Sequence, residues 1–380
     1  MTKERRKDMI YLDYNATTPV DPRVVKAMTP YFTEIFGNPS TLYGLGAHAH
    51  DAVAHARQQV AHLLGAQASE ILFTSCGSES DNMVVKGVAL TQQAKGKHII
   101  TSQIEHPAIL EALHFLEQHF GIEVTYLPVD HHGLVDPADV AAAIRPDTIL
   151  VTVMFANNEV GTIQPIKAIG EICHQQHVLF HTDASQAVGK VPIDVADLQV
   201  DFLTVAGHKI YAPKGIGALY IRDGLQLEPL LHGASQENGR RAGTENVPYD
   251  VALGAAAELM QAELPQAHLR QLRDDFVAQL RKVFGDEIQV NGDLAQGLPT
   301  TANISFLGHN GAEILRDLPG LAATTGSACH AGSKKISPVL AAMGVDPQIA
   351  AGAIRFSVGR YTTQSELDHA VHLLENLIHS

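Results

Sequence analysis

Short apolar runs alternate with helical patterns between about residues 65 and 221. Seven of these runs are bounded by glycine, proline or polar turn residues: EILFTS, KHIITS, VTYLPV, TILVTVMF, VLFHTD, DFLTVAG and GALYI. Their nearly continuous apolar character is typical of strands that are buried on both faces, although a short apolar run also fits a buried helix. The pattern therefore predicts an α/β fold with a mostly parallel, seven-stranded sheet sandwiched by helices.

The pattern changes beyond about residue 250, where ALGAAAELMQAELPQAHLRQLRDDFVAQLRKVFG forms a long helical pattern. Pro265 interrupts it and is expected to kink or break the helix. EIQVNG, TANISFLG and AIRFSVGR then predict strands, with helices between them and a final helix from about Gln364. We expect a large domain at 16–257 and a smaller α+β domain formed by 1–15 and 258–380.

The chain of 380 residues exceeds what one hydrophobic core usually organises, which also favours two domains. Its net charge of −14 argues against nucleic acid as a direct ligand, because phosphate binding needs a basic surface. The first residues, MTKERRKDMIYLD, lack the apolar run of a secretory signal, and no stretch is long enough to span a bilayer. We therefore expect a cytoplasmic protein without a membrane partner.

Three cysteines are too few and too far apart in sequence for a disulfide framework, and they suit free thiols in a reducing compartment. Cys173 falls within the helical pattern IKAIGEICHQQH and is expected to pack in a core. Cys76 is expected to serve a turn. The third, Cys329, is the candidate for chemistry.

Cys329 lies in a loop of small and polar residues at about 323–337, where packing cysteines are uncommon. His330, Lys334 and Lys335 would lower the pKa of the thiol if the loop folds toward them. The composition of the loop therefore predicts a reactive thiolate.

Lys209 ends an apolar strand in the segment DFLTVAGHKIYAPKGIG and is flanked by small residues. A lysine at the mouth of a strand suits a Schiff base with an aldehyde cofactor such as pyridoxal phosphate. The alternative is an ordinary surface lysine in a loop.

A strand passes through a glycine turn into a helix in the segment EILFTSCGSESDN. The amides of such a helix start bind anions, so Gly77 and the Ser78 hydroxyl are candidates for phosphate binding. The alternative is that Ser78 caps the helix, with Asp81 completing a box-like pattern. Neither a dinucleotide GxGxxG fingerprint nor a P-loop is present there, so nucleotide cofactors gain no support.

Polar residues also follow two other predicted strands. Asp183 ends one strand and suits a partner for a protonated pyridine nitrogen, although an aspartate here also suits a helix cap. Gln186 is a candidate contact to the ring hydroxyl, and Asn158 in NNEVG is either a cofactor contact or a turn residue. Together with Ser78 and Lys209, these residues lie beyond the carboxyl ends of strands, where open α/β sheets bind ligands.

His106 follows a further strand, in IEHPA, and is placed to stack on a cofactor ring or to move a proton. His174 and His177 lie close together in sequence, but no cysteine or carboxylate completes a ligand pattern around them. No metal site is therefore expected.

Arg355 lies in AIRFSVGR, where period-two alternation places Ile354, Phe356 and Val358 on one face and Arg355 on the other. A guanidinium there can bind the α-carboxylate of an amino acid through two parallel hydrogen bonds. The alternative is a surface ion pair.

Ten motifs carry a resemblance over nearly the whole chain: YLDYNATTPVDP, FGNPST, FTSCGSESDN, EHPA, NNEVG, HTDASQ, AGHKIYAPKGIGALY, RRAGTEN, GSACHAG and IRFSVGR. Their types and order resemble the cysteine desulfurases of the NifS/IscS kind. The resemblance implies the fold-type I architecture of pyridoxal-phosphate transferases and a homodimer. It also implies conversion of L-cysteine to L-alanine, with the sulfur left on the enzyme as a persulfide.

The resemblance also implies roles for individual residues. The cofactor ring would be held by Lys209 as a Schiff base and by Asp183, His106, Gln186 and Asn158. The cofactor phosphate would be held by Gly77, Ser78 and His208, and by Thr244 of the other subunit. Arg355 would bind the substrate carboxylate with Asn15 and Asn158, Lys209 would move the α-proton, and Cys329 would take the sulfur.

Two departures from the family pattern leave alternatives open. Ala206 stands where many relatives have a serine that contacts the phosphate, so cofactor affinity is weaker or another donor replaces that hydroxyl. His330 directly follows Cys329, as in selenocysteine lyases. The competing hypotheses are a selenocysteine lyase, another pyridoxal-phosphate lyase or aminotransferase, and a catalytically silent binding protein. The sulfur acceptor is expected to be a protein such as an iron–sulfur scaffold or a tRNA or DNA thiolation enzyme.

Overall fold

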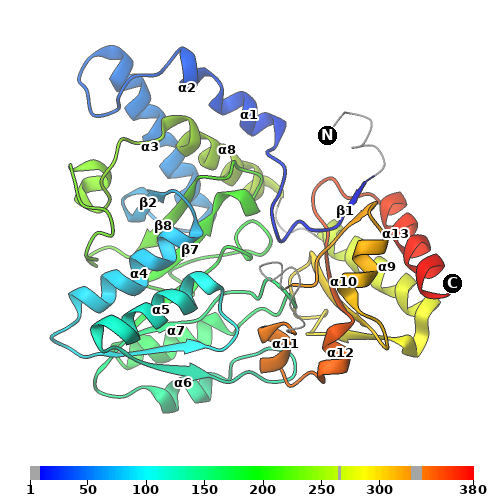
Figure 1. Ribbon diagram of the computed structural model, residues 1–380. Coiled ribbons are helices and arrows are strands. Elements are labelled where there is room, and N and C mark those ends of the chain that lie inside the picture. The colour runs from blue at the N-terminus through cyan, green and yellow to red at the C-terminus, as the bar shows by residue number, and fades with distance from the viewer. Residues whose placement is uncertain (1–8, 264–266, 327–335) are drawn as a thin grey trace.

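The computed structural model describes residues 9–263, 267–326 and 336–380. Figure 1 shows a larger body built around a sheet and, beside it, a smaller body that contains the carboxyl terminus. The domain boundaries expected from the sequence stay a prediction.

The larger body is built on a seven-stranded sheet with the strand order β2-β8-β7-β6-β5-β3-β4. Strand β8 runs antiparallel to β2 and β7, and the other adjacent pairs are parallel. The strands are β2 (Ile71–Thr74), β3 (His98–Ser102), β4 (Glu123–Leu127), β5 (Thr148–Thr152), β6 (Leu179–Asp183), β7 (Phe202–Ala206) and β8 (Gly217–Ile221). Each of the seven apolar runs forms one strand, so the predicted mostly parallel sheet is confirmed.

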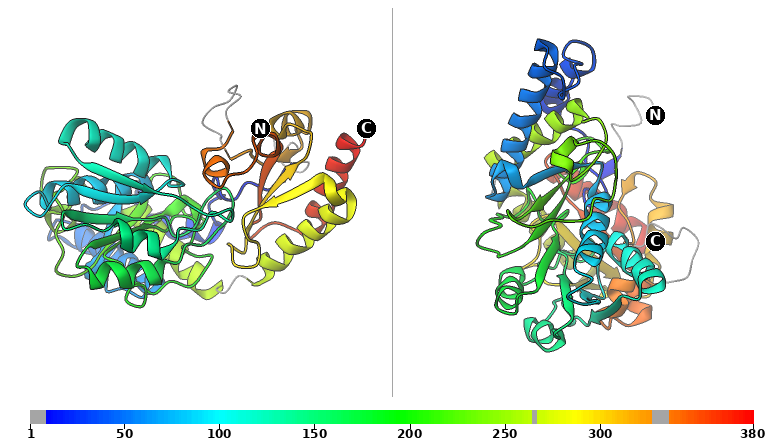
Figure 2. Two further views of the ribbon diagram at one scale, coloured as in Figure 1. Left: turned by 90° about the horizontal axis from the view of Figure 1, so that it is seen from below. Right: turned by 90° about the vertical axis from the view of Figure 1, so that its left-hand side faces the viewer.

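Both faces of this sheet are covered, as period-two alternation requires. In β2, Ile71 and Phe73 pack into one hydrophobic cluster while Leu72 between them packs into another. The first cluster draws on α3, α6, α7 and α8, and the second on α4 and α5. Figure 2 shows these two helical layers on either side of the sheet. An exception to full burial is the edge strand β4, in which most side chains are partly exposed.

The helices of the larger body are α1 (Pro22–Met28), α2 (Pro30–Thr33), α3 (Gly44–Leu64), α4 (Gly77–Thr91), α5 (Pro107–Phe120), α6 (Pro137–Ala143), α7 (Ile166–Gln175) and α8 (Val247–Glu263). Helices α4 to α7 connect successive strands of its sheet, whereas α1 to α3 precede β2 and α8 follows β8. Short 3-10 turns lie at Ala68–Glu70, Gly207–Lys209 and Gln236–Gly239. Helices α1, α5 and α6 begin with a proline after an aspartate or histidine that caps the first turn, which fixes where each helix starts.

The smaller body has its own hydrophobic core, formed by an antiparallel sheet with the order β12-β10-β9 and the helices packed on it. Its elements are α9 (Ala267–Phe284), a 3-10 turn (Gly285–Glu287), β9 (Ile288–Asn291), β10 (Thr301–Phe306), α10 (Gly311–Asp317), β11 (Leu321–Ala322), α11 (Pro338–Ala342), α12 (Pro347–Ala351), β12 (Ala353–Ser357) and α13 (Gln364–Ile378). The amino-terminal strand β1 (Ile10–Tyr11) pairs in parallel with β11 and so joins this body.

The long helical pattern is divided as Pro265 predicts. Helix α8 packs in the core of the larger body and α9 in that of the smaller one, and residues 264–266 between them are outside the described part. Within the described residues, no helix combines the length and the apolar character needed to cross a membrane.

Candidate active site

A pocket of about 340 Å³ lies where loops after several strands of the large sheet face β12 of the smaller body. Parallel strands bring their carboxyl ends to one edge of a sheet, so residues far apart in the chain meet there. The structure brings into this pocket every predicted site residue except Thr244 and Cys329. The predicted residues that line it are Asn15, Gly77, Ser78, His106, Asn158, Asp183, Gln186, His208, Lys209 and Arg355.

Lys209 ends the 3-10 turn that follows β7, and its side chain reaches the pocket rather than bulk solvent. Its Nζ donates hydrogen bonds to the backbone oxygens of Asn15 (2.5 Å) and Ala16 (2.9 Å). Burial first, and the nearby charge of Arg355 second, lower the pKa of this amine to about 8. A neutral lysine amine is the reactive form, so this environment suits a nucleophile.

Helix α4 begins at Gly77 and directs its first turn at the pocket. Cys76 is the N-cap residue, so the alternative in which Ser78 caps the helix with Asp81 is wrong. Glu79 accepts a hydrogen bond from the backbone amide of Ser75 at 2.7 Å and so stabilises the turn instead. Ser78 is left to line the pocket beside amides that have no partner within the helix.

Gly77 lies close to the side chains of Ser185, Ala206 and Thr204. A Cβ atom at this position would lie 3.1 Å from Ser185 Oγ and 3.3 Å from the Cβ of Ala206. Ser185 also lines the pocket, so a hydroxyl stands next to the position where Ala206 supplies none. Ser185 was not among the predicted site residues, although it follows Asp183 by two positions.

Asp183 closes β6, and its Oδ1 accepts the backbone amide of Ser185 at 2.9 Å. The carboxylate therefore stabilises the following turn, as the capping alternative predicts, and it also lines the pocket. In the same turn, Gln186 donates from Nε2 to the backbone oxygen of Asn15 at 2.9 Å. This bond fixes the side chain against the amino-terminal segment.

Two histidines flank these groups. His106 is the N-cap of α5, and its Nδ1 accepts the amide of Ala108 at 3.1 Å, which leaves Nε2 to carry the proton of the neutral ring. Burial lowers the pKa of His106. The Nδ1 of His208 lies 3.1 Å from the Thr17 hydroxyl, and burial, with the charge of Lys209 second, lowers the pKa of His208 to about 4. His208 is therefore neutral near pH 7.

Arg355 extends from β12 into the pocket and is almost fully buried. Its Nη2 lies 2.6 Å from Asp13 Oδ1, and its Nη1 donates to the backbone oxygen of Asn158 at 2.9 Å. Its buried Nε has no hydrogen-bond partner within the described residues. The alternative of a surface ion pair is wrong, because the Arg355 side chain is buried, Asp13 is only partly exposed, and one buried donor of the guanidinium is left without a partner in the described residues.

Two predicted residues do not join this pocket. Thr244 lines a separate pocket of about 230 Å³, which also contains Arg241 and Asp250. Cys329 lies outside the described residues, as do His330, Lys334 and Lys335. The expectation for Cys173 is confirmed, since it is buried in α7, where burial raises the pKa of its thiol to about 12.

The pocket also contains residues that sequence reasoning missed. They are Ala16, Cys76, Asp81, Met154, Ala156, Ser185 and Gly326, of which Cys76 and Asp81 had been considered in other roles; Ala206, expected beside the cofactor phosphate, also lines the pocket. Most lie within one to three residues of a predicted site residue, so the motifs pointed to the right segments. Asp13 was missed as the partner of Arg355, because residues 342 positions apart give no sequence signal of their contact.

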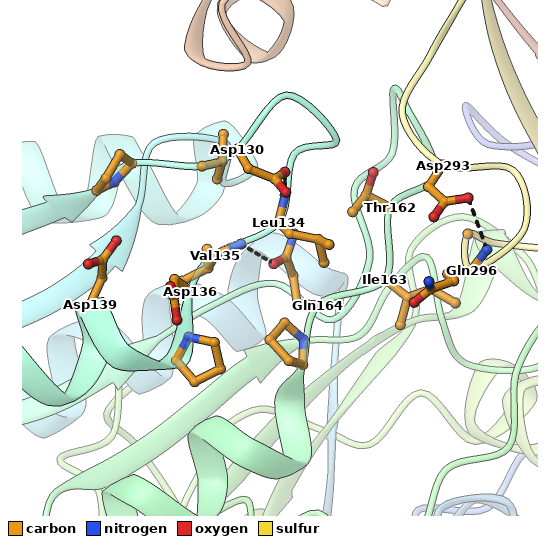
Figure 3. A pocket seen from close by; sticks show the side chains of 15 residues that line it. Asp130, Leu134, Val135, Asp136, Asp139, Thr162, Ile163, Gln164, Asp293 and Gln296 are labelled. Carbon is orange, nitrogen blue, oxygen red and sulfur yellow. Dashed lines mark hydrogen bonds between the residues drawn. The ribbon is translucent and has the colours of Figure 1, made fainter.

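A larger cavity, of about 780 Å³, lies between the two bodies and is lined by Asp130, Asp136, Asp139 and Asp293 (Figure 3). The carboxylates of Asp130, Asp136 and Asp293 each accept backbone amides of their own turn. They therefore stabilise local turns. The smaller pocket around Lys209 combines an amine of lowered pKa with a carboxylate and a guanidinium, and it is the better candidate for chemistry.

This constellation on a mostly parallel sheet indicates an enzyme, and known proteins that are similar to this chain indicate the same. Residues 10–370 match the family described as aminotransferase class-V. The chain is 47% identical to a cysteine desulfurase IscS of Dictyoglomus turgidum, covering 98% of this chain and 95% of the relative. The chain therefore belongs to the class-V aminotransferase family, among its cysteine desulfurases.

Two solved structures have the same fold. A NifS-like protein matches with a TM-score of 0.91 at 39% identity, covering 98% of this chain and 99% of that one. A protein described as SspA in complex with cysteine matches with a TM-score of 0.81 at 39% identity, covering 93% of this chain and 99% of that one. The predicted fold-type I architecture is thereby confirmed.

Proposed function

We propose that this protein is a pyridoxal-phosphate-dependent cysteine desulfurase that converts L-cysteine to L-alanine and receives the sulfur on Cys329 as a persulfide. The observation that carries the proposal is the single pocket in which Lys209, Asp183 and Arg355 meet. The relatives support it, since curated proteins of similar sequence are described as cysteine desulfurases and one similar structure is described as a complex with cysteine.

The residues of the pocket fit pyridoxal phosphate. An amine of lowered pKa suits its aldehyde, the carboxylate of Asp183 suits a protonated ring nitrogen, and the start of α4 with Ser78 suits its phosphate. His208, which is neutral near pH 7, would offer a ring N–H to the phosphate, and Gln186 and Asn158, which line the same pocket, would contact the ring hydroxyl. When bound, the cofactor supplies an electron sink for the α-carbon of the substrate.

Arg355 is proposed to bind the substrate carboxylate. Its Nε is a buried donor without a partner in the described part, and Asp13 and the backbone oxygen of Asn158 hold the guanidinium through Nη2 and Nη1. Asn15 adds an amide at the same wall of the pocket. Charge-assisted, bidentate contacts of this kind orient an amino acid as well as bind it.

Lys209 and Cys329 are proposed to carry out proton transfer and sulfur transfer, respectively. The Lys209 amine moves the proton of the substrate α-carbon, which is efficient because it is tethered beside that carbon. The Cys329 thiolate then attacks the substrate sulfur, so that a sulfur–sulfur bond forms as the carbon–sulfur bond breaks. The electron pair of the broken bond stays with carbon, which takes up a proton to become alanine. His106 is placed to stack on the ring and to carry a proton on Nε2.

We also propose a cytoplasmic homodimer, in which Thr244 completes the phosphate site of the partner. Thr244 lies outside the pocket of its own chain, which supports a role in another one. Large apolar side chains are exposed in α2 and in the loop between α2 and α3, which supports a contact surface there: Phe32, Phe36, Leu42 and Tyr43. The acceptor of the persulfide is proposed to be a protein of iron–sulfur assembly or of tRNA or DNA thiolation.

The test compares wild-type protein with Lys209→Ala, each supplied with pyridoxal phosphate, a thiol reductant, and L-cysteine or L-selenocysteine. The proposal expects alanine from L-cysteine with wild type and none with Lys209→Ala. Alanine from selenocysteine alone would replace the proposal by a selenocysteine lyase, which the Cys329-His330 sequence favours as the second candidate. A requirement for an oxo-acid would indicate an aminotransferase.

A further inference from the structure

Lys190 is a buried lysine that has no part in the mechanism above. It lies in the turns that follow β6, where its backbone amide donates to the oxygen of Ala187 at 2.9 Å. Its side chain is only 8% exposed, so the amine lies in the protein interior rather than in solvent. Lysine is almost never buried to this extent unless the amine has specific partners.

The amine contacts two residues that line the pocket. Lys190 Nζ donates to Gln186 Oε1 at 2.7 Å and to Asn15 Oδ1 at 3.0 Å. A side-chain amide has a donor end and an acceptor end of nearly the same shape, and only its hydrogen bonds decide which end points where. Both a charged and a neutral amine have two N–H groups for these two oxygens. Lys190 therefore turns the oxygens of both amides toward itself.

The opposite ends of the two amides are fixed as a result. Gln186 Nε2 donates to the backbone oxygen of Asn15 at 2.9 Å, and Asn15 Nδ2 donates to Thr301 Oγ1 at 2.8 Å and to the backbone oxygen of Asn158 at 3.2 Å. The Asn15 oxygen also accepts from Lys209 at 2.5 Å. Asn15 thus contacts both lysines: its side-chain oxygen accepts from Lys190 and its backbone oxygen accepts from Lys209.

The electrostatic surroundings disfavour a lysine at this place. Burial first, and then the charges of Lys209 and Arg355, lower the pKa of Lys190 well below its usual range. Within the described residues, no carboxylate is hydrogen-bonded to its amine. An apolar side chain of the same length would avoid the cost of burying this amine, so packing alone does not account for a lysine.

We infer that Lys190 is a positioning residue: it holds the amides of Gln186 and Asn15 in one orientation, and so fixes the hydrogen bonds by which they order the wall of the pocket that would face the cofactor and the substrate. This inference rests on the proposed function. It assigns Lys190 no contact with the reacting atoms, and it predicts that the effect of removing the amine passes through the two amides.

The test is Lys190→Met, which keeps an unbranched apolar stem as far as Cε and removes the amine with its donors. We expect kcat/KM for L-cysteine to fall on the order of 10- to 100-fold, because small misplacements at a reacting centre have effects of this size. We expect the absorption maximum of bound pyridoxal phosphate to shift, and its dissociation constant to rise roughly 2- to 10-fold, as for loss of a hydrogen bond. In the background Asn15→Ala with Gln186→Ala, Lys190→Met is expected to change each quantity less than about 2-fold.

Lys95→Met is the matched control, since Lys95 also donates a hydrogen bond, to the backbone oxygen of His177 at 2.6 Å, but lies outside the pocket. It should leave the kinetics and the spectrum unchanged. Wild-type kinetics and spectrum for Lys190→Met would overturn the inference. So would an equal loss in both backgrounds, which is the signature of a merely structural role.

If Lys190→Met does not fold, Lys190→Gln replaces it, because it keeps a donor on a chain one bond shorter. Lys190→Gln is then compared in the wild-type protein and in the Asn15→Ala, Gln186→Ala protein. A change in kcat/KM and in the absorption maximum that occurs only where both amides are present supports the inference, and an equal change in both proteins overturns it. The proposed function is tested separately by wild type. Wild type that forms no alanine from L-cysteine refutes that function, whereas active wild type with a silent Lys190→Met refutes the positioning role alone.

Discussion

The amine of Lys209 should react with pyridoxal phosphate over a pH range that an ordinary lysine does not reach. Its pKa is lowered from 10.5 to about 8, by burial first and by Arg355 second. At pH 7, about one amine in ten is then neutral, compared with about one in three thousand for a lysine of ordinary pKa, a gain of roughly 300-fold. Only the neutral amine attacks an aldehyde, so this gain applies directly to the rate of cofactor attachment.

The sign of the pH dependence follows from the proton on the amine. As pH rises through about 8, Lys209 loses its proton, so the rate of attachment should rise and then level off. The assay mixes cofactor-free protein with pyridoxal phosphate in a stopped-flow instrument and follows the absorbance of the covalent adduct from pH 6 to 10. A parallel series with a lysine derivative in solution corrects for titration of the cofactor itself.

Arg355→Met provides the perturbation. Removing this cation takes away one cause of the lowered pKa, so the midpoint of the rate should move upward from about 8 while the plateau remains. Lys209→Ala should form no adduct. A midpoint near 10.5 in the wild-type protein, or no movement with Arg355→Met, would refute the reasoning.

Three further predictions concern other parts of the molecule. Arg355→Lys should raise KM for L-cysteine on the order of 10- to 100-fold with a smaller effect on kcat, because an ammonium replaces a bidentate donor. Steady-state kinetics measures both constants, and a fall in kcat with KM unchanged would contradict this prediction. Ala206→Ser should tighten binding of pyridoxal phosphate roughly 2- to 10-fold in an equilibrium titration, since it adds a hydroxyl beside Gly77 and Ser185, and weaker binding would contradict this. Cys173, buried with a pKa raised to about 12, should resist iodoacetamide in the folded protein at pH 8, whereas mass spectrometry that finds it labelled without unfolding would contradict its placement.

The strands of the large sheet were predictable because each is a short apolar run bounded by turn residues. Their spatial order was not, because it depends on contacts between runs. Strand β8 is antiparallel and β4 is partly exposed because of the position that each takes in the sheet. That position is not encoded by the residues of a single strand. The pairing of β1 with β11 involves two residues in each strand, too few to show a periodic pattern.

The candidate site was predictable as far as each residue follows a strand. Ser78, Asn158, Asp183 and Lys209 all lie in one pocket, although their individual roles stay predictions. The contact between Asp13 and Arg355 could not be read from the sequence, because it forms between the two ends of the chain.

Lys190 was missed for a different reason. A lysine is normally assumed to be exposed, and only the structure shows its amine buried between two amides. The cue available in the sequence was its position four residues after Gln186, which became informative only when the turn between them was known.

The central claim is that Cys329 takes the sulfur of L-cysteine in a reaction that depends on pyridoxal phosphate. The most direct test measures alanine formed from L-cysteine, with the cofactor and a thiol reductant, by wild-type protein and by Cys329→Ala. The account predicts alanine from the wild type and none from the variant, although both bind the cofactor. No alanine from either protein despite bound cofactor, or equal alanine from both, would contradict it.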